Sequence, residues 1–136
     1  MKLEWMDSWS VGVQQLDQEH RQLIDLINEL RVTHEVGLKG SERQIKIHEV
    51  VSELIWYAEN HFRFEESLMA AAGYPDLAAH RKSHLLFRVQ LSNLAMSFHG
   101  EEGDLLDLYG FLAGWIRFHV LETDQLYSPF LQAINQ

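Results

Sequence analysis

The sequence of 136 residues contains no cysteine and only two prolines. Without cysteine the chain can form neither disulfides nor thiolate zinc sites nor iron–sulfur clusters, so any bound metal must be held by histidine, aspartate or glutamate. Nowhere does the sequence reach about 18 consecutive apolar residues, and its first residues lack the apolar segment of a secretory signal. We therefore expect a soluble, cytoplasmic protein that does not span a membrane.

Basic residues are also scarce, since 11 lysines and arginines face 20 aspartates and glutamates, for a formal net charge of -9. The basic residues are scattered along the chain, which argues against a nucleic-acid partner or an anionic membrane surface. A small neutral or cationic ligand fits this charge better. Hydrophobic residues make up 46% of the sequence, enough for the core of a single domain over residues 1–136. No pattern indicates the oligomeric state.

Four segments show helical periodicity and none alternates like a strand, which predicts an all-α, antiparallel up-down-up-down four-helix bundle. We expect an N-terminal arm at about 1–15 and helices at about 16–36, 41–72, 76–99 and 104–127. Gly37 and Gly73 are expected to end the first two helices. Ser41 and Gln44 form a predicted capping box at the start of the second.

Seven ionisable side chains fall on the inward stripes of these helices, where an apolar core would not bury charge without a use for it. They are His20, His61, Glu65, His80, His84, His119 and Asp124. Residues four apart on a helix lie about 40° and about 6 Å from each other, so each such pair can reach one point. The antiparallel order of the helices brings all seven to the same end of the bundle.

The spacing between His119 and Asp124 departs from this rule. Five residues turn a regular helix by about 500°, which would leave the two side chains about 140° apart. We therefore predict a π-bulge or a local unwinding between Val120 and Asp124, of the kind that interrupts helices at functional sites.

Nitrogen and oxygen donors without sulfur favour iron, although manganese and zinc accept the same donors. Two octahedral ions offer about twelve coordination positions between them. Five imidazoles, two bridging carboxylates and a bridging oxide or hydroxide would fill all but one of these positions. The remaining position is the predicted binding site for an external ligand.

Taken singly, each of these residues has a simpler interpretation. A lone histidine on a helix stripe is more often a hydrogen-bonded core residue, and a lone His-x-x-x-Glu is more often a surface pair. Only the convergence of all seven at one depth indicates a metal site. His34, His48 and His99 are expected not to be ligands, and His34 lies about 21 Å beyond His20 along its helix.

Two further sets of residues receive structural predictions. Trp5, Trp9 and Trp56 are expected to be packing residues, with the arm folded across the bundle. Glu66 is expected to be solvated or to hydrogen-bond a ligand from outside.

The motifs around the seven donors resemble the hemerythrin family, and in particular its bacterial single-domain members, over nearly the whole chain. They are Trp5, Val11-Gly12-Val13, Leu16-Asp17 with His20, His61-Phe62-x-x-Glu65-Glu66, Gly73-Tyr74-Pro75, His80-x-x-x-His84 and Trp115-x-x-x-His119-x-x-x-x-Asp124-x-x-Tyr127.

The resemblance implies two iron ions with one open coordination position. His80, His84 and His119 would hold one iron, and His20 with His61 would hold the other. Glu65 and Asp124 would bridge the two, and the open position would belong to the His20/His61 iron. Dioxygen would bind there reversibly.

The resemblance also implies an apolar oxygen pocket. Its residues would be Leu23, Phe62, Trp115, Ile116 and Val120. Two positions depart from the family: Ile116 stands where leucine is frequent, and Gln125 follows the bridging aspartate where lysine is common. These departures bear on the lifetime of bound oxygen more than on metal binding.

Three functions remain open at this stage. The first is oxygen binding for storage, transport or delivery, and the second is oxygen or redox sensing for a signalling partner or for a further domain of a longer protein. The third is a di-iron enzyme such as an oxidase, a peroxidase or a nitric oxide handling protein. Di-iron oxidases use more carboxylates, in Glu-x-x-His motifs, so we expect a binding protein and not an enzyme.

Overall fold

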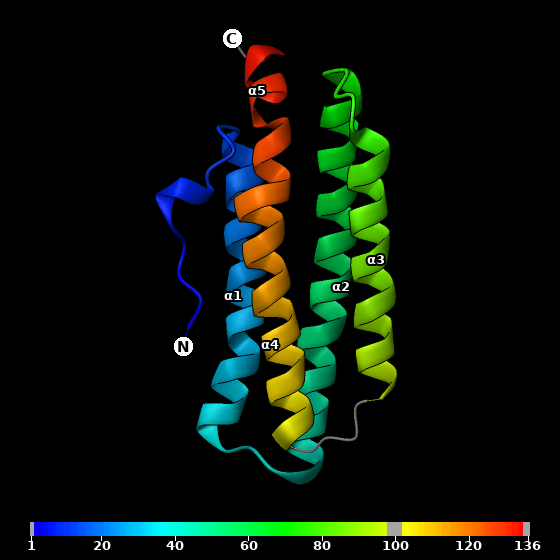
Figure 1. Cartoon of the computed structure of the whole chain (residues 1–136). Coiled ribbons are helices and arrows are strands. Elements are labelled where there is room, and N and C mark those ends of the chain that lie inside the picture. Colours follow the sequence, from blue (N-terminus) through cyan, green and yellow to red (C-terminus); the bar gives the residue numbers. More distant parts are fainter. Residues whose placement is uncertain (1, 98–101, 135–136) are drawn as a thin grey trace.

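The computed structural model describes residues 2–97 and 102–134, and within them it is almost entirely helical (Figure 1). In chain order the elements are the short 3-10 helix η1 (Asp7–Trp9), α1 (Gln14–Val36), α2 (Gly40–Ala71), α3 (Leu77–Met96), α4 (Glu102–Phe118), the π-helical turn η2 (His119–Thr123) and α5 (Asp124–Ile134).

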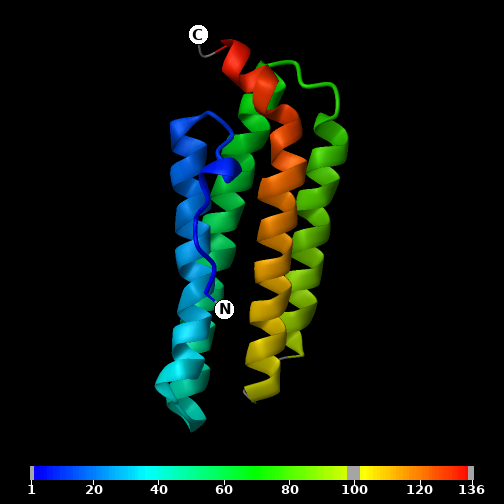
Figure 2. The same ribbon diagram turned by 60° about the vertical axis from the view of Figure 1, so that its left-hand side comes forward.

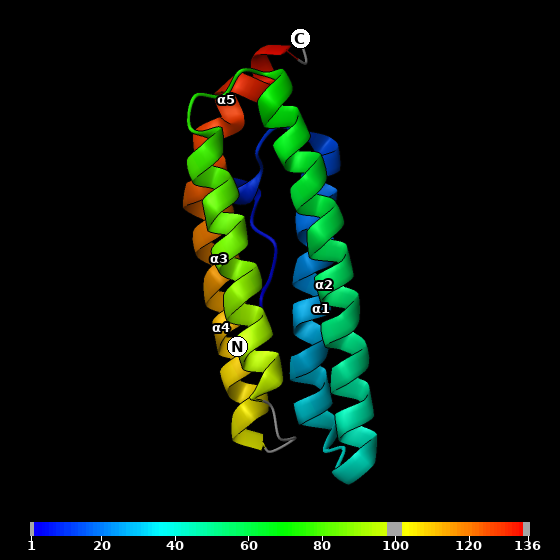
Figure 3. The ribbon, with the colours of Figure 1, turned by 90° about the vertical axis from the view of Figure 1, so that its right-hand side faces the viewer.

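The predicted four-helix bundle is confirmed. α1, α2, α3 and the continuous rod of α4, η2 and α5 run alternately down and up, and Figure 3 shows α1 beside α2 and α3 beside α4. Each helix turns an apolar stripe inward, because residues three and four apart share a face. The buried core accordingly includes Leu23, Leu54, Leu91 and Leu112. None of the described helices is long and apolar enough to cross a membrane.

Glycine ends the first helix as predicted, whereas the start of the second differs from the prediction. Gly37 adopts the left-handed conformation with φ of 76° directly after α1, and its N–H donates to the His34 carbonyl. α2 begins at Gly40, and Lys39 before it makes no side-chain cap hydrogen bond. The predicted capping box at Ser41 is therefore wrong, because the N-cap position lies two residues earlier, at Lys39, and the helix begins with Gly40 at φ of 60°.

The last helical rod extends further than predicted, to Ile134 instead of about residue 127, with Pro129 inside it. Ser128 donates a hydrogen bond of 2.7 Å to the Val11 carbonyl, and Leu131 is buried. Packing against the N-terminal arm thus outweighs the tendency of Pro129 to break the helix. The third helix ends earlier than predicted, at Met96 with Ser97 as its C-cap, and the predicted last residue, His99, lies outside the described residues.

The N-terminal arm runs lengthwise along the bundle in front of α1 (Figure 2). Leu3 exchanges two hydrogen bonds with the buried Asn28 side chain, of 3.0 and 2.8 Å. Trp9 is buried, and the Trp5 ring packs edge-on against it, with the ring centroids 6.1 Å apart. The arm therefore packs as expected through these two tryptophans.

Trp56 does not pack as predicted, because its side chain is 65% exposed. It follows the inward-facing Leu54 by two positions, which is about 200° around a helix. Trp56 therefore points away from the core of the bundle.

Candidate metal centre

All seven predicted donors meet inside the bundle, toward the end where α2 turns into α3 (Figure 1). Each is at most 3% exposed. The residues are His20 from α1, His61 and Glu65 from α2, His80 and His84 from α3, His119 from η2 and Asp124 from α5. α1, α2, α3 and the rod of α4, η2 and α5 therefore each contribute at least one side chain, although α4 itself contributes none.

Six of the seven side chains, all except Asp124, fall into two groups that could each hold a metal ion. Glu65, His80, His84 and His119 form one group, with donor atoms within 4.8 Å of one another. The second group is His20, His61 and Glu65. Because Glu65 belongs to both groups, the arrangement suits two neighbouring ions that share a carboxylate.

The two oxygens of Glu65 face different groups. Its Oε1 lies 2.8 Å from His80 Nε2 and 3.0 Å from His84 Nε2. Its Oε2 lies 3.1 Å from His61 Nε2 and 3.4 Å from His20 Nε2. A carboxylate whose oxygens are divided in this way could serve both groups at once.

Asp124 is placed in the same way. Its Oδ2 lies 3.1 Å from His20 Nε2, and its Oδ1 lies 2.9 Å from His119 Nε2 and 3.1 Å from His80 Nε2. Asp124 and His119 both face inward because η2 between them is π-helical, which confirms the predicted interruption of the last helix.

The outer nitrogens of three imidazoles are held by neighbouring side chains. His61 Nδ1 and His84 Nδ1 each lie 2.7 Å from a carboxylate oxygen, of Glu19 and Glu66 respectively. Ser83 Oγ lies 3.4 Å from His119 Nδ1. Such contacts fix the ring so that Nε2 points inward as the donor atom.

Some of these outer contacts were not anticipated from the sequence. Glu66 was expected either to be solvated or to contact a ligand, and the structure shows the contact. Glu19 was not predicted, because it precedes His20 and neighbouring positions point about 100° apart on a helix. The last residue of the Trp115–Tyr127 motif, Tyr127, donates a 2.9 Å hydrogen bond from its hydroxyl to Glu65.

Several inward atoms lack the hydrogen bonds that buried polar atoms normally have. The Nε2 atoms of His20 and His61 and both oxygens of Asp124 are buried without a hydrogen-bond partner. The Nε2 atoms of His84 and His119 face each other at 3.1 Å. Convergent lone pairs without donors between them fit bound cations, so the residues present suit two metal ions.

The charges of the cluster also favour bound cations. Burial lowers the pKa of His20, but Asp124 and Glu65 outweigh burial and raise that pKa to about 10. Burial is likewise outweighed by the two carboxylates at His80, whose pKa rises to about 9. Burial would raise the pKa of Glu65, yet the surrounding imidazoles, His61 foremost, hold it well below its usual range. The carboxylates thus favour positive charge at the imidazoles, supplied by protons or by metal.

Two residues of the predicted oxygen pocket, Phe62 and Trp115, contact the donors, and the other three are buried in the hydrophobic core. Leu23, Ile116 and Val120 are at most 3% exposed. The Phe62 ring stacks on His84 with centroids 3.8 Å apart, and the Trp115 ring stacks on His119 at 4.3 Å. All five belong to, or pack against, one hydrophobic cluster, and the rings of Phe62 and Trp115 give the donors an aromatic wall on this side.

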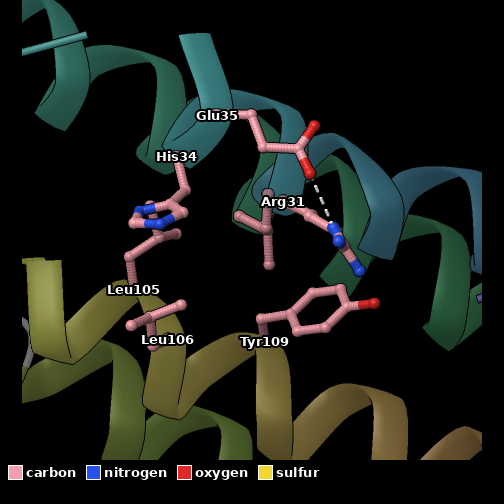
Figure 4. A pocket seen from close by; sticks show the side chains of 7 residues that line it. Arg31, His34, Glu35, Leu105, Leu106 and Tyr109 are labelled. Carbon is pink, nitrogen blue, oxygen red and sulfur yellow. Dashed lines mark hydrogen bonds and ion pairs between the residues drawn. The ribbon is translucent and has the colours of Figure 1, made fainter. Parts of the chain in front are cut away.

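His34 and His48, two of the remaining histidines, lie away from the donor cluster. His48 is exposed on α2, and His99 lies outside the described residues. His34 lines a cavity of about 400 Å³ between α1 and α4 (Figure 4). Its walls are Leu30, Arg31, His34, Glu35, Leu105, Leu106 and Tyr109. His34 lies about 21 Å along the helix from His20, so this cavity is separate from the donor cluster.

Known proteins resemble the chain in sequence and in fold. The family model described as "Hemerythrin HHE cation binding domain" matches residues 11–131. A bacteriohemerythrin of Stenotrophomonas maltophilia (strain R551-3) is 33% identical over 135 residues, which cover 98% of this chain and 85% of that protein. A bacteriohemerythrin of Clostridium acetobutylicum is 31% identical over 128 residues, covering 90% of this chain and 96% of that protein.

A solved structure agrees with these sequence matches. The crystal structure of wild-type hemerythrin superposes with a TM-score of 0.80 at 29% identity, covering 96% of this chain and 98% of that chain. The matched sequence, the shared bundle and the two donor groups are consistent with one another. This chain therefore belongs to the hemerythrin HHE cation-binding family.

Proposed function

We propose that this protein holds two iron ions and binds dioxygen reversibly at them. The observation that carries the proposal is the pair of donor groups that share Glu65, with buried imidazole nitrogens and Asp124 oxygens that lack hydrogen-bond partners. Membership of the hemerythrin family supports the choice of iron and of dioxygen.

The proposed ligands are the seven residues of the cluster. His80, His84 and His119 would hold one iron, His20 and His61 the other, and Glu65 with Asp124 would bridge them. When bound, the iron pair supplies the electrons for reversible oxygen binding. Because the His20/His61 iron has one imidazole fewer, the oxygen would bind on that side.

The protein's own part in this function is to position the donors and to exclude water. Glu19, Glu66 and Ser83 hold three of the imidazoles from outside. The proposed oxygen pocket consists of Leu23, Phe62, Trp115, Ile116 and Val120. An apolar wall keeps protons away from the oxygen, so that it can leave again unchanged.

The same wall favours a binding protein over an enzyme, since these five side chains include no carboxylate or imidazole to serve as a general acid or base. Oxygen or redox sensing is the second candidate. It is favoured by the side chain of Gln125, which hydrogen-bonds both the N-terminal arm and η2.

A visible absorption spectrum tests the proposal. Anaerobically reduced, iron-loaded protein, verified to contain two irons per chain, would be measured before oxygen, after oxygen and again under argon. We expect an oxygen-dependent band that appears and then vanishes, while protein treated with a chelator shows none. A ferric spectrum that persists under argon and is reversed only by a reductant would overturn reversible binding and favour a redox sensor or an enzyme.

A further inference from the structure

Three backbone carbonyls converge on the side-chain amide of Gln125, a half-buried residue of α5. The Nε2 atom lies 3.2 Å from the Trp9 and Ser10 carbonyl oxygens and 3.3 Å from the Val120 carbonyl oxygen. Trp9 and Ser10 belong to the N-terminal arm, whereas Val120 lies inside η2. One side chain therefore joins the arm to the π-helical turn.

That turn lies between two of the proposed ligands. η2 begins at His119 and is followed directly by Asp124, and Gln125 is the next residue. Both ligands face inward only while the turn keeps its π-helical geometry. A contact that holds the Val120 carbonyl therefore acts on the segment that aims His119 and Asp124.

The arm is fixed on its other side as well. Asp17 of α1 accepts hydrogen bonds from the Val11 N–H, at 2.9 Å, and from the Ser10 hydroxyl, at 2.5 Å. Gly12 has φ of 75°, and a side chain there would meet Gln132 of α5 at 2.2 Å. The arm thus packs in one defined position, close against α1 and α5.

From these contacts we infer that Gln125 is a positioning residue that couples docking of the N-terminal arm to metal binding. The inference rests on the proposed ligand roles of His119 and Asp124. Docking of the arm, through Gln125, favours the turn geometry that both ligands need. Because coupling between two sites is reciprocal, bound metal also tightens docking of the arm by the same factor.

Replacing Gln125 tests the coupling. Gln125→Leu keeps a similar volume and removes both N–H donors. We expect ferrous iron, loaded anaerobically, to be released to a chelator about 10- to 100-fold faster than from the unmodified protein. This is the loss of metal affinity usual when a residue that supports metal ligands is replaced, taken up by the release rate. Gln125→Lys offers three N–H donors to the three carbonyls and should restore slow release.

Amide hydrogen exchange of residues 2–13 supplies a readout that does not depend on oxygen binding. In the unmodified protein, exchange in the arm should be slower with iron than with chelator. In Gln125→Leu the arm should exchange at the same rate in both conditions. Gln90→Leu is the matched control, because Gln90 is exposed on α3, and it should change neither measurement.

A second variant releases the arm without touching Gln125. Asn28→Leu removes the hydrogen bonds that hold Leu3 at the far end of the arm. It should also speed iron release, which keeps the test valid if Gln125→Leu fails to fold. The inference would be overturned if a folded variant releases iron and protects the arm as the unmodified protein does. That result would leave the proposed function standing. An unmodified chain that binds fewer than two irons would instead overturn the proposed function.

Discussion

At the scale of single residues, Glu65 has the central place in the cluster. Its oxygens face both donor groups, its side chain is fully buried, and Tyr127 donates a hydrogen bond to it. The structure offers no second carboxylate on α2 that could replace it at the same depth, since Glu66 points outward to His84 Nδ1. Loss of Glu65 would therefore affect both proposed ions at once.

Substitutions of proposed ligands should lower metal content selectively. We expect Glu65→Ala and His84→Ala to bind fewer than two metal ions per chain, because each removes a proposed ligand. His48→Ala should retain the full content, since His48 is exposed on α2. Elemental analysis after dialysis against a metal buffer measures this, and equal loss in all three variants would contradict the ligand assignment.

The sequence predicted the convergence of the seven side chains better than the contacts around them. Helical spacing alone brings His61 to Glu65 and His80 to His84, because both members of each pair lie on one helix. The contact between Glu19 and His61 joins two helices, and its geometry depends on how α1 and α2 are rotated against each other. Such contacts between helices cannot be derived from the periodicity of either one.

At the scale of secondary structure, the π-helical turn η2 is the clearest case of a local irregularity that spacing could predict. Two inward donors five residues apart do not fit a regular helix, and the turn accommodates the additional residue. The course of α5 beyond Pro129 could not be predicted in this way. It is held by Ser128 and Gln132, which contact Val11 at the other end of the chain.

Changing the number of residues between His119 and Asp124 should show whether the direction of these two side chains decides metal binding, with or without a π-helical turn. Deleting Leu121 leaves the histidine and the aspartate four residues apart, about 40° on a regular helix, so both still face inward. Inserting an alanine between Glu122 and Thr123 separates them by six residues, which leaves the two side chains about 120° apart on a regular helix. We expect the deletion variant to keep two metal ions per chain and the insertion variant to lose metal.

Metal content and circular dichroism of both variants would check this expectation. The dichroism spectrum confirms that each variant still forms the bundle. An insertion variant that folds and keeps its full metal content would show that Asp124 is not a ligand.

At the scale of the whole molecule, the protonation of the cluster makes stability depend on pH in the metal-free protein. The pKa values of His20 and His80 rise on folding, to about 10 and about 9. Their contribution to stability is complete below the ordinary histidine pKa of about 6.5 and is lost as the pH rises through these values. The lowered pKa values of Glu65 and Asp124 act in the opposite sense, and their contribution is lost in acid.

We therefore expect the free energy of unfolding of the metal-free protein to fall between about pH 7 and about pH 10. Burial lowers the pKa of His84, so the contribution of His84 to stability changes with pH in the opposite sense. That change is confined to pH values below the ordinary histidine pKa of about 6.5. The iron-loaded protein should not show the alkaline loss, because its imidazoles are already deprotonated, and should instead lose metal in acid. Urea unfolding with chelator and with iron measures both, and a metal-free stability that rises toward about pH 10 would contradict the expectation.

The bridging position of Asp124 has a consequence for the topology of the chain. His20 and Asp124 lie about a hundred residues apart in sequence, and their side chains are 3.1 Å apart. An ion held by both would close a loop that spans most of the protein, and closing a long loop restricts the unfolded chain as a cross-link does. In a sequence without cysteine, the metal centre would thus act as a reversible cross-link, which a chelator removes and a thiol reductant does not.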